Sequence, residues 1–314
     1  MPEKQTAIYL GQALADYGFK DGHPFGPQRH ESFKTELLNQ QLDKQLILLE
    51  PVLANPERIA LFHTNDYIEK VSDYSKTGHG YLDGGDTPSF TGMFEAASHV
   101  AGSVTDAIDR IMAGEFSRAF SPIAGLHHAR RHVAAGFCVF NDCGIAIEYL
   151  RAQYGIKRVA YIDIDAHHGD GVFYSFEDDA DLLFADIHQD GRTLYPGTGF
   201  TQETGKGAAE GTKLNIPVPP FSDDAVFESV WPQVEAYLEA GKPEFILLQC
   251  GADSIEGDPI TNMAFSPASH AHAARSLRDI ADRHCQGRML GMGGGGYNHD
   301  NIARGWTAVV AEMV

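Results

Sequence analysis

In the carboxyl-terminal two thirds of the chain, short apolar runs alternate with longer segments in which apolar residues recur every three or four positions. The short runs predict buried strands, and the longer segments predict amphipathic helices. Their alternation is typical of a parallel α/β sheet. The predicted strands are residues 119–126, 159–164, 182–188, 244–250 and 288–292, and the predicted helices are residues 141–154, 223–240, 269–284 and 301–313.

The first third of the chain predicts one strand, three helices and two long loops. The strand is residues 7–10, and a loop containing Gly, His and Pro follows at 17–29. Leucines at 37, 38, 42, 46 and 49 recur at near-helical spacing, so a helix is predicted there, ending at Pro51. Further helices are predicted around residues 66–71 and from 94 to 114, and the glycine-rich segment 77–92 between them is predicted to be a functional surface loop.

The composition predicts one large globular domain. The chain has 314 residues, 43% of them hydrophobic, and we find no repeat, low-complexity tract or linker, so residues 1–314 are expected to form a single domain. Lys and Arg total 24 against 43 Asp and Glu, and the resulting net charge of −19 repels nucleic-acid phosphate and anionic membranes. We therefore expect no direct nucleic-acid binding.

The cysteines and the apolar runs indicate a cytoplasmic protein. The four cysteines form no CxxC pair, and Cys138, Cys143 and Cys250 lie in apolar contexts typical of reduced, buried thiols. No run is long enough to span a bilayer, and the first residues, MPEKQTAIYL, lack the features of a secretion signal. The sequence leaves the oligomeric state open, and an oligomer is compatible with it.

The segment YIDIDAHHGDG, residues 161–171, places metal-ligating side chains at the end of a predicted strand. Because alternate side chains of a strand share a face, Asp163, Asp165 and His167 are expected to project in one direction. Two carboxylates and an imidazole are costly to gather unless a cation neutralises them, so the arrangement favours a divalent metal. The alternative is a turn in which the two aspartates cap the following helix.

A further carboxylate, Asp253, follows the predicted strand 244–250. In open parallel sheets the carboxyl ends of the strands are where ligands bind. Asp165, His167 and Asp253 could hold a metal there and leave one coordination position for water or substrate. This oxygen-rich set accepts ferrous iron as well as zinc. The alternative for Asp253 is an ordinary turn.

Two adjacent histidines, His127 and His128, follow the predicted strand 119–126 and could transfer protons near neutral pH. We expect Asp163 to hold His127 and Asp170 to hold His128, each through an Nδ1 proton, which fixes the tautomer as in a hydrolase triad. The alternatives are that both histidines are loop residues and that Asp170 only shapes a turn.

Four glycines, residues 293–296, precede Tyr297. The segment lacks the GxxxxGK[ST] pattern of a phosphate-binding loop, so nucleotide binding is not expected. Four glycines make a sterically open backbone, which would let Tyr297 approach the metal and donate its hydroxyl to a developing oxyanion. The alternative is a tyrosine that packs at the start of the following helix.

Four motifs together resemble the zinc-dependent histone deacetylase family. They are GLHHARRHVAAGFCVFNDCGIAI, YIDIDAHHGDGV, QCGADSIEGDP and GMGGGGYN, and their order and spacing match along nearly the whole chain. Within the family, the sequence is similar to bacterial deacetylases of the acetoin-utilisation type. The resemblance implies the arginase/deacetylase fold, an α/β class in which a mainly parallel eight-stranded sheet is flanked by helices in a single domain.

The resemblance also implies the roles of the matching residues. It makes Asp165, His167 and Asp253 the zinc ligands. It makes His128 the general base and acid, His127 its electrostatic partner, Asp163 and Asp170 the residues that orient the two histidines, and Tyr297 the residue that polarises the amide carbonyl together with the metal. In the substrate channel it implies that Asp86 of GGDTPSF anchors the substrate backbone, that Phe137 after Gly136 lines the channel, and that Arg29 of HPFGPQRH lies near the acetate exit.

Relatives also bind a structural potassium ion beside the zinc, through carboxylates matching Asp163 and Asp165 and through backbone carbonyls. Many of them have a serine at the position of Asp186, where it helps to hold that ion. The aspartate could weaken this site or bind the ion more strongly, and the sequence does not decide between the two.

The implied reaction is hydrolysis of an N-acetylated amine, most simply N6-acetyl-lysine in a protein or peptide, to the free amine and acetate. Acetylated polyamines or other small amides are the alternative, and the strong acidity of the chain favours cationic substrates. Two further readings are an arginase-like binuclear hydrolase and a catalytically silent protein that binds acyl-lysine. The silent protein would lack a catalytic group, whereas both histidines, the three ligands and Tyr297 are present here.

Overall fold

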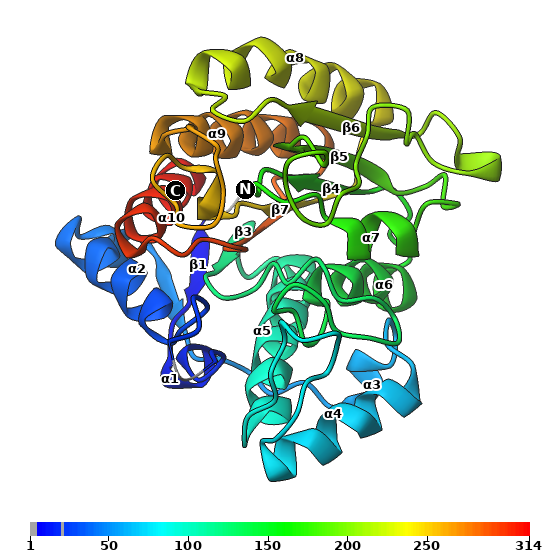
Figure 1. Cartoon of the computed structure of the whole chain (residues 1–314). Helices are drawn as coiled ribbons and strands as arrows, with labels where there is room; N and C mark the ends of the chain where they lie inside the picture. Colours follow the sequence, from blue (N-terminus) through cyan, green and yellow to red (C-terminus); the bar gives the residue numbers. More distant parts are fainter. Residues whose placement is uncertain (1–4, 20–21) are drawn as a thin grey trace.

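The computed structural model describes residues 5–19 and 22–314, and these contain one eight-stranded sheet. The strands are β1 (Thr6–Tyr9), β2 (Ile47–Leu49), β3 (Arg118–Ser121), β4 (Val159–Asp163), β5 (Leu183–Gln189), β6 (Lys213–Val218), β7 (Phe245–Gln249) and β8 (Met289–Met292). Their order is β2-β1-β3-β8-β7-β4-β5-β6, and every neighbouring pair is parallel (Figure 1). Residues 1–4 and 20–21, the latter within the predicted loop 17–29, lie outside the described residues.

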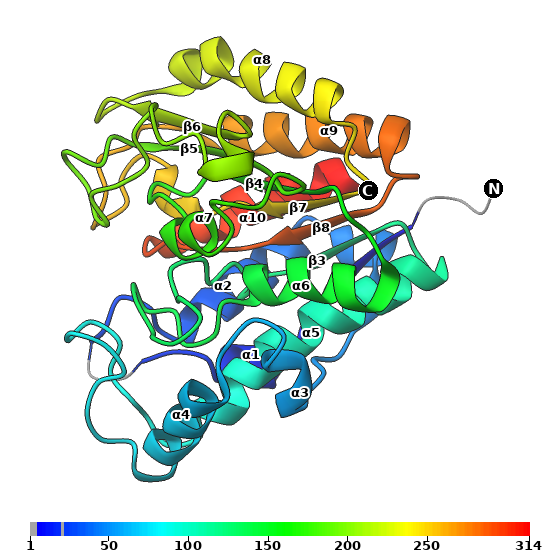
Figure 2. The ribbon, with the colours of Figure 1, turned by 90° about the vertical axis from the view of Figure 1, so that its right-hand side faces the viewer.

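Helices cover both faces of this sheet. They are α1 (Gln12–Ala15), α2 (Gln28–Asn39), α3 (Pro56–Ile59), α4 (Asn65–Thr77), α5 (Met93–Ala113), α6 (Asp142–Tyr154), α7 (Asp170–Ser175), α8 (Asp224–Gly241), α9 (Pro267–His284) and α10 (His299–Met313). Helices α8, α9, α10 and α2 pack in succession on one face, and α5 and α6 lie on the other (Figure 2). The prediction of a single α/β domain with helices on both sides of an eight-stranded sheet is confirmed.

The central strands are apolar because both faces of the sheet are covered. Every residue of β4, β5 and β7 is buried, and a strand buried on both sides has no solvent-facing positions to alternate with apolar ones. For this reason the predicted strands 159–164, 182–188 and 244–250 agree with the observed bounds to within one or two residues. The predicted helices of the second half also agree with the observed bounds to within two residues.

The leucine-rich segment 37–49 was wrongly predicted as one helix. Helix α2 ends at Asn39, and Gln41 has a left-handed backbone with φ of 56°. A short 3-10 turn, Leu42–Gln45, follows, and Ile47–Leu49 then pair with β1 as an edge strand. Pairing with β1 therefore overrides the helical spacing, since the strand conformation lets Ile47 and Leu49 pack against the core.

Three smaller differences arise at the edges of elements. The predicted strand 119–126 ends at Ser121, because the next residue, Pro122, has no N–H to donate to a neighbouring strand. Strand β6 was not predicted; it is an edge strand, and its Pro217 is tolerated there. Arg29 belongs to helix α2 rather than to the preceding loop.

The cysteines agree with the expectation of buried, reduced thiols. All four cysteines are free thiols and all are buried. Within residues 5–19 and 22–314, none of the helices combines the length and the apolar character that crossing a bilayer requires.

Candidate active site and metal centre

The predicted site residues meet at the carboxyl edge of the sheet, where β3, β4, β7 and β8 end. The segment after β3 leads to His127 and His128, and the segment after β4 carries residues 165–170. Asp253 lies in a short 3-10 turn after β7, and Tyr297 follows the glycines after β8. Because all these strands are parallel and adjacent, their ends deliver the side chains to one place.

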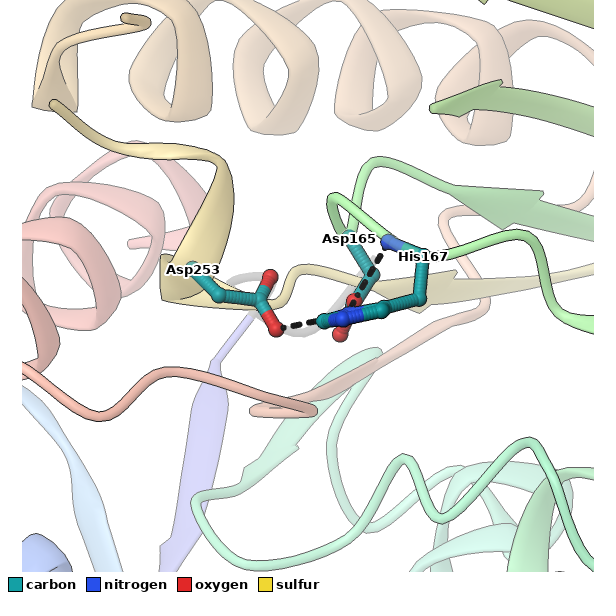
Figure 3. Close-up of side chains that lie close together, drawn as sticks. All are labelled: Asp165, His167 and Asp253. Carbon is teal, nitrogen blue, oxygen red and sulfur yellow. Dashed lines mark hydrogen bonds and ion pairs between the residues drawn. The ribbon is translucent and has the colours of Figure 1, made fainter. Parts of the chain in front are cut away.

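Asp165, His167 and Asp253 form a buried cluster whose ligand atoms all lie within 4.8 Å of one another. Nδ1 of His167 is 3.0 Å from Oδ1 of Asp165 and 3.2 Å from Oδ2 of Asp253 (Figure 3). The other carboxylate oxygens are held from behind, since Oδ2 of Asp165 accepts from Gln249 Nε2 and Gly295 N, and Oδ1 of Asp253 accepts from Ala166 N. One oxygen of each carboxylate and one ring nitrogen thus face a common point.

This donor set fits a divalent cation. Burial, followed by the charge of Asp165, raises the pKa of Asp253 to about 7. Burial would also raise the pKa of Asp165, but His127 and His167 hold it well below its usual value. Burial alone would lower the pKa of His167, yet its hydrogen bonds to Asp165 and Asp253 raise it to about 10. Without a cation, protons on His167 and Asp253 offset the negative charge of this cluster, and a metal ion would replace them.

Asp163 is not part of this cluster, and its side chain instead reaches the neighbouring His127. Strand β4 ends at Asp163, and the strict alternation of side chains ends with it. Its Oδ2 lies 2.7 Å from Nδ1 of His127 and also accepts from the hydroxyl of Tyr161. The separate prediction that Asp163 holds His127 matches this geometry.

The two histidines are each held by a carboxylate and face each other. Nδ1 of His128 is 2.7 Å from Oδ1 of Asp170, and the Nε2 atoms of His127 and His128 are 3.1 Å apart. Both Nδ1 atoms face carboxylates, so both carry protons. Only one further proton fits between the two Nε2 atoms.

That proton belongs to His127. Burial would lower its pKa, but the carboxylates of Asp163 and Asp165 raise the pKa to about 10. Burial and the neighbouring charge of His127 instead lower the pKa of His128 to about 4. These shifts favour a protonated His127 and a neutral His128 that is held at its Nδ1–H by Asp170.

The start of helix α6 anchors the backbone of both histidines, which the sequence did not predict. Asn141 caps this helix by accepting from Gly144 N, and its Nδ2 donates to the carbonyl oxygens of His127 and Ala129. The next residue, Asp142, accepts from the N–H groups of residues 125 and 126. The sequence signal was the polar N-cap, whose second function depends on a contact between separate segments.

A small cavity joins the metal cluster, the histidines and Tyr297. Its volume is about 10 Å³, roughly the space of one water molecule. The ring of Tyr297 packs against Phe25 and Phe137, with ring centroids 6.4 Å and 5.8 Å away, and its backbone N–H donates to Asp258. Burial and the charge of Asp253 raise the pKa of the Tyr297 hydroxyl well above its usual value, so the hydroxyl keeps its proton.

Gly136 and Phe137 form the wall beside His128. Gly136 has φ of 54°, and a Cβ there would lie 2.4 Å from Cδ2 of His128. Phe137 also has a left-handed backbone, with φ of 66°, and its carbonyl accepts from the hydroxyl of Tyr17. The turn therefore presses its backbone against His128 while the Phe137 ring faces Tyr297.

Asp86 lies at the outer end of this wall. Thr87 links the two, because its hydroxyl donates to Oδ1 of Asp86 and accepts from the N–H of Phe137. Burial and the nearby Asp83 raise the pKa of Asp86 to about 6. Asp83 in turn accepts from three backbone N–H groups of this loop, those of residues 85, 86 and 87.

Arg29 is buried behind the cavity. Its Nε donates to the carbonyl of Gly296, and Nη2 donates to the carbonyl of Gly294 at 2.5 Å. The guanidinium lies over the ring of Phe25, 3.8 Å from its centroid. Its Nη1 is also buried, and no residue among 5–19 and 22–314 forms a hydrogen bond with it. The side chain therefore shapes the glycine segment before Tyr297 and offers one free N–H pair.

Tyr195 also lies at the site, although its sequence context did not indicate a functional role. Its ring centroid is 5.2 Å from that of His128 and 6.4 Å from that of His167, and the residue is 45% exposed. It lies in the loop after β5, far from the motifs that carried the resemblance. A single aromatic residue before a proline gives no signal of its own in a sequence.

Asp186 has partners that the sequence did not reveal. It pairs with Asp163 in the register of β4 and β5 and is fully buried. Its Oδ1 is 2.6 Å from Nδ1 of His188, and its Oδ2 accepts from Gly169 N. The carboxylate charge therefore already has a histidine beside it.

Comparison with known proteins agrees with this geometry. The family model of the histone deacetylase domain matches residues 23–313. The chain belongs to the histone deacetylase family. Among the relatives of this deacetylase, the acetoin utilization protein AcuC of Bacillus subtilis (strain 168) is 38% identical over 326 residues, covering 99% of this chain and 82% of that protein. The AcuC protein of Staphylococcus xylosus is 33% identical, with coverage of 99% and 83%.

A solved structure supports the same assignment. The crystal structure of the HDA15 HD domain matches the deacetylase with a TM-score of 0.91 and 26% sequence identity, covering 99% of this chain and 88% of that one. The family match and the AcuC relatives identify the chain as a hydrolase of the deacetylase type.

Proposed function

We propose that this deacetylase hydrolyses an N-acetylated amine, with N6-acetyl-lysine in a protein or peptide as the first candidate, and releases the free amine and acetate. The observation that carries the proposal is the single cavity lined by the three-residue cluster, both histidines and Tyr297. A nucleophilic water, a base and an oxyanion donor are the three requirements of amide hydrolysis, and residues able to supply each of them line this cavity.

Asp165, His167 and Asp253 would hold the metal, with zinc as the first candidate and ferrous iron as the second. When bound, such an ion acts as a Lewis acid and lowers the pKa of water to near neutrality. The two carboxylates are held by backbone and Gln249 hydrogen bonds, and the His167 ring already faces both of them, so the ligands need little rearrangement to take the ion.

His128 would take a proton from the attacking water and then give it to the leaving amine. Its Nδ1–H is held by Asp170, and its Nε2, which lies at the cavity 3.1 Å from Nε2 of His127, is the acceptor that would have to turn to the attacking water. His127 would stay protonated between Asp163 and His128, so that its charge stabilises negative charge that develops beside it.

Tyr297 would donate its hydroxyl to the acetyl oxygen as that oxygen becomes negative. The raised pKa keeps this hydroxyl protonated, and the packing of its ring between Phe25 and Phe137 limits its movement. An oxyanion donor held in place before the reaction loses no energy to reorganisation during it.

The acyl-amine chain would enter along Phe137, which follows the glycine that contacts His128, and along Tyr195, whose ring lies beside the same histidine. Asp86, at the outer end of the Phe137 wall, would accept hydrogen bonds from the substrate backbone. Arg29, with its unpaired Nη1 behind the cavity, would hold the departing acetate. Acetylated polyamines are the second candidate substrates, because the net charge of −19 attracts cationic amines.

The direct test is a parallel assay of the purified zinc-loaded protein against acetyl-lysine peptides and acetylated polyamines. We expect acetate release from at least one class, and the ratio of kcat/KM values decides between them. Metal analysis of the same sample should give one transition metal per chain. Two would favour the arginase-like reading, and a protein inert toward both classes would contradict the proposal.

A further inference from the structure

Asp186 and His188 form a buried pair on β5, next to the site but outside the metal cluster. Both residues have 0% exposure. Nδ1 of His188 is 2.6 Å from Oδ1 of Asp186, and Nε2 of His188 is 2.8 Å from the carbonyl oxygen of Gly199. The second oxygen of Asp186 accepts from Gly169 N at 2.9 Å. The pair thus connects β5 to the segment that returns from the following loop.

Both ring nitrogens of His188 face oxygen atoms that can only accept hydrogen bonds. A carboxylate and a carbonyl have no proton to offer, so each nitrogen must carry its own and the ring is an imidazolium. Burial opposes this charge, but Asp186 raises the pKa of His188 above its ordinary value. The positive charge of His188 therefore neutralises the negative charge of the Asp186 carboxylate.

The carbonyl that His188 holds lies at the end of the loop 190–199. The residue before it, Thr198, has its hydroxyl 2.9 Å from Nδ1 of His168, and the rings of His168 and His188 lie 4.9 Å apart. The contact is close, since a Cβ on Gly199 would lie 2.4 Å from Nε2 of His188 and 2.6 Å from Cγ of His168. The end of the loop rests directly on the two buried rings.

This same loop carries Tyr195 to the catalytic histidine. The ring of Tyr195 is nearly half exposed and stands 5.2 Å from the ring of His128. A half-exposed side chain has little packing of its own to fix its position. The position of Tyr195 over the site therefore depends on how firmly residues 190–199 are anchored below.

We propose that Asp186 and His188 are positioning residues that anchor the loop 190–199 and so keep Tyr195 in place as a wall of the acyl-amine site. The link from Tyr195 to substrate rests on the proposed function, whereas the anchoring of the loop does not. Asp186 would then serve His188, and direct binding of a potassium ion by Asp186 is the competing role that the last experiment below tests.

The first test measures anchoring without any catalytic assay. Arg192 lies in the loop with a side chain that is 77% exposed, so trypsin cleavage after it reports opening of the loop. In His188→Gln, cleavage should be about tenfold faster or more, because a charge-assisted hydrogen bond to the loop is lost. The control is His272→Gln, since His272 packs on Phe227 and Trp231 under α8, and its cleavage should match that of the wild type.

A second variant disturbs the same contact from the side of the loop. Gly199→Ala leaves the buried pair in the sheet intact, but its methyl group must push the loop away from His188. Trypsin should cleave Gly199→Ala as fast as it cleaves His188→Gln. This second variant keeps the anchoring role testable even if His188→Gln folds poorly. Unchanged cleavage in Gly199→Ala would overturn the anchoring role.

The second test asks whether the pair acts through Tyr195. His188→Gln should raise KM for an acetyl-lysine peptide more than it lowers kcat, and Tyr195→Ala should do the same. Combining the two should add little to Tyr195→Ala alone, since the anchored side chain is already missing. If His188→Gln raised KM by the same factor in the wild type and in Tyr195→Ala, His188 would act in another way. If no variant or wild type deacetylates the peptide, the proposed function fails while the trypsin result still stands.

The competing explanation is that Asp186 binds a potassium ion, and a change of salt tests it. Wild-type cleavage is compared in potassium chloride and in choline chloride of equal ionic strength, and we expect the same rate in both. Faster cleavage in choline chloride that disappears in Asp186→Asn would mean that Asp186 holds a cation, and it would overturn the proposal.

Discussion

The Nε2 atoms of His127 and His128 lie 3.1 Å apart while the opposite nitrogen of each ring is held by its own aspartate. In this arrangement the pKa values of two chemically identical side chains shift in opposite directions, upward for His127 and downward for His128. Asp163 lies on a strand between two others and is fully buried, whereas Asp170 begins a short helix and also accepts from Arg130. The different environments of the two carboxylates thus favour His127 as the cation, which leaves His128 as the proposed base.

The first prediction concerns Asp170, whose carboxylate raises the pKa of His128 against the effect of burial. In Asp170→Asn this contribution is lost, so His128 becomes a weaker base and its tautomer is no longer fixed. We expect kcat to fall within the range of about 10²–10⁴-fold that general acid–base catalysis contributes. Steady-state kinetics at saturating substrate measures it, and metal content should stay at the wild-type level. Near-native kcat would exclude His128 as the base.

The second prediction concerns the Tyr297 hydroxyl. Tyr297→Phe keeps the ring contacts with Phe25 and Phe137 and removes only the hydrogen-bond donor. If the hydroxyl is a full oxyanion donor, kcat should fall by about 10²–10³-fold with KM little changed. Bound metal and thermal stability should be unaffected. A variant that retains its metal and its turnover would defeat the assignment.

The third prediction concerns removal of the metal. A chelator should lower Tm, because the buried carboxylates of Asp165 and Asp253 then lose the cation that binds only the folded chain, and one equivalent of zinc should restore it. Asp253→Asn should lose most of its bound metal and respond little to the chelator. Asp300→Asn, at an exposed carboxylate on α10, is the matched control and should behave as the wild type. Equal Tm with and without metal in the wild type would argue against the site.

The fourth prediction concerns the close contact of Gly136 with His128. Gly136→Ala would place a methyl carbon 2.4 Å from Cδ2 of His128, so the histidine must move and kcat should fall. Gly155→Ala is the control, because Gly155 has a comparable φ of 68° but no atom within 4 Å of the position that a Cβ would take. The control should lose only the stability that a left-handed alanine costs, about 1 kcal/mol, and keep full activity. Equal kinetic losses in both would show that the contact is unimportant.

The fifth prediction concerns the pH dependence of stability through His63. Burial lowers the pKa of His63 to about 3, compared with 6.5 for the free side chain. Its Nε2 accepts from Asn141 N and its Nδ1 faces the carbonyl of Arg131, so the folded ring is neutral. Between these pKa values the unfolded chain binds a proton that the folded chain does not, and stability therefore falls as the pH decreases.

The His63→Gln variant isolates this effect, since glutamine can donate and accept at both contacts without titrating. Between about pH 6 and pH 5 the wild type should lose up to about 1.4 kcal/mol more unfolding free energy than the variant. Denaturant unfolding of both proteins at several pH values measures the difference. Parallel stability curves would mean that His63 takes up its proton in the folded state.

The fold was largely predictable because the central strands are buried on both faces of the sheet, and such strands are continuous apolar runs in the sequence. Strand β4 is uniformly apolar until Asp163, and α6 is bounded by Asn141 and Gly155, whose capping geometries are both observed. The segment 37–49 could not be read correctly, because its leucines suit a helix or an edge strand and only pairing with β1 decides between them. Local pattern is informative where local and long-range preferences agree.

The site residues that belong to sequence motifs could be predicted. A residue whose position depends on how a long loop folds could not. The pairing of His127 with Asp163 and of His128 with Asp170 followed from the need of each imidazole for an acceptor. Tyr195 could not be found this way, since its position depends on the fold of the loop 190–199. The roles of the motif residues in catalysis stay predictions that the variants above will test.

Strand β8 is synthesised last of the eight, yet it lies between β3 and β7 in the middle of the sheet. Before residues 289–292 leave the ribosome, a growing chain can form at most two separate half-sheets, one containing β1 to β3 and the other containing β4 to β7. Each half then has an unpaired edge that can join another chain. We expect nascent chains of this protein to need protection from aggregation until the final strand closes the gap.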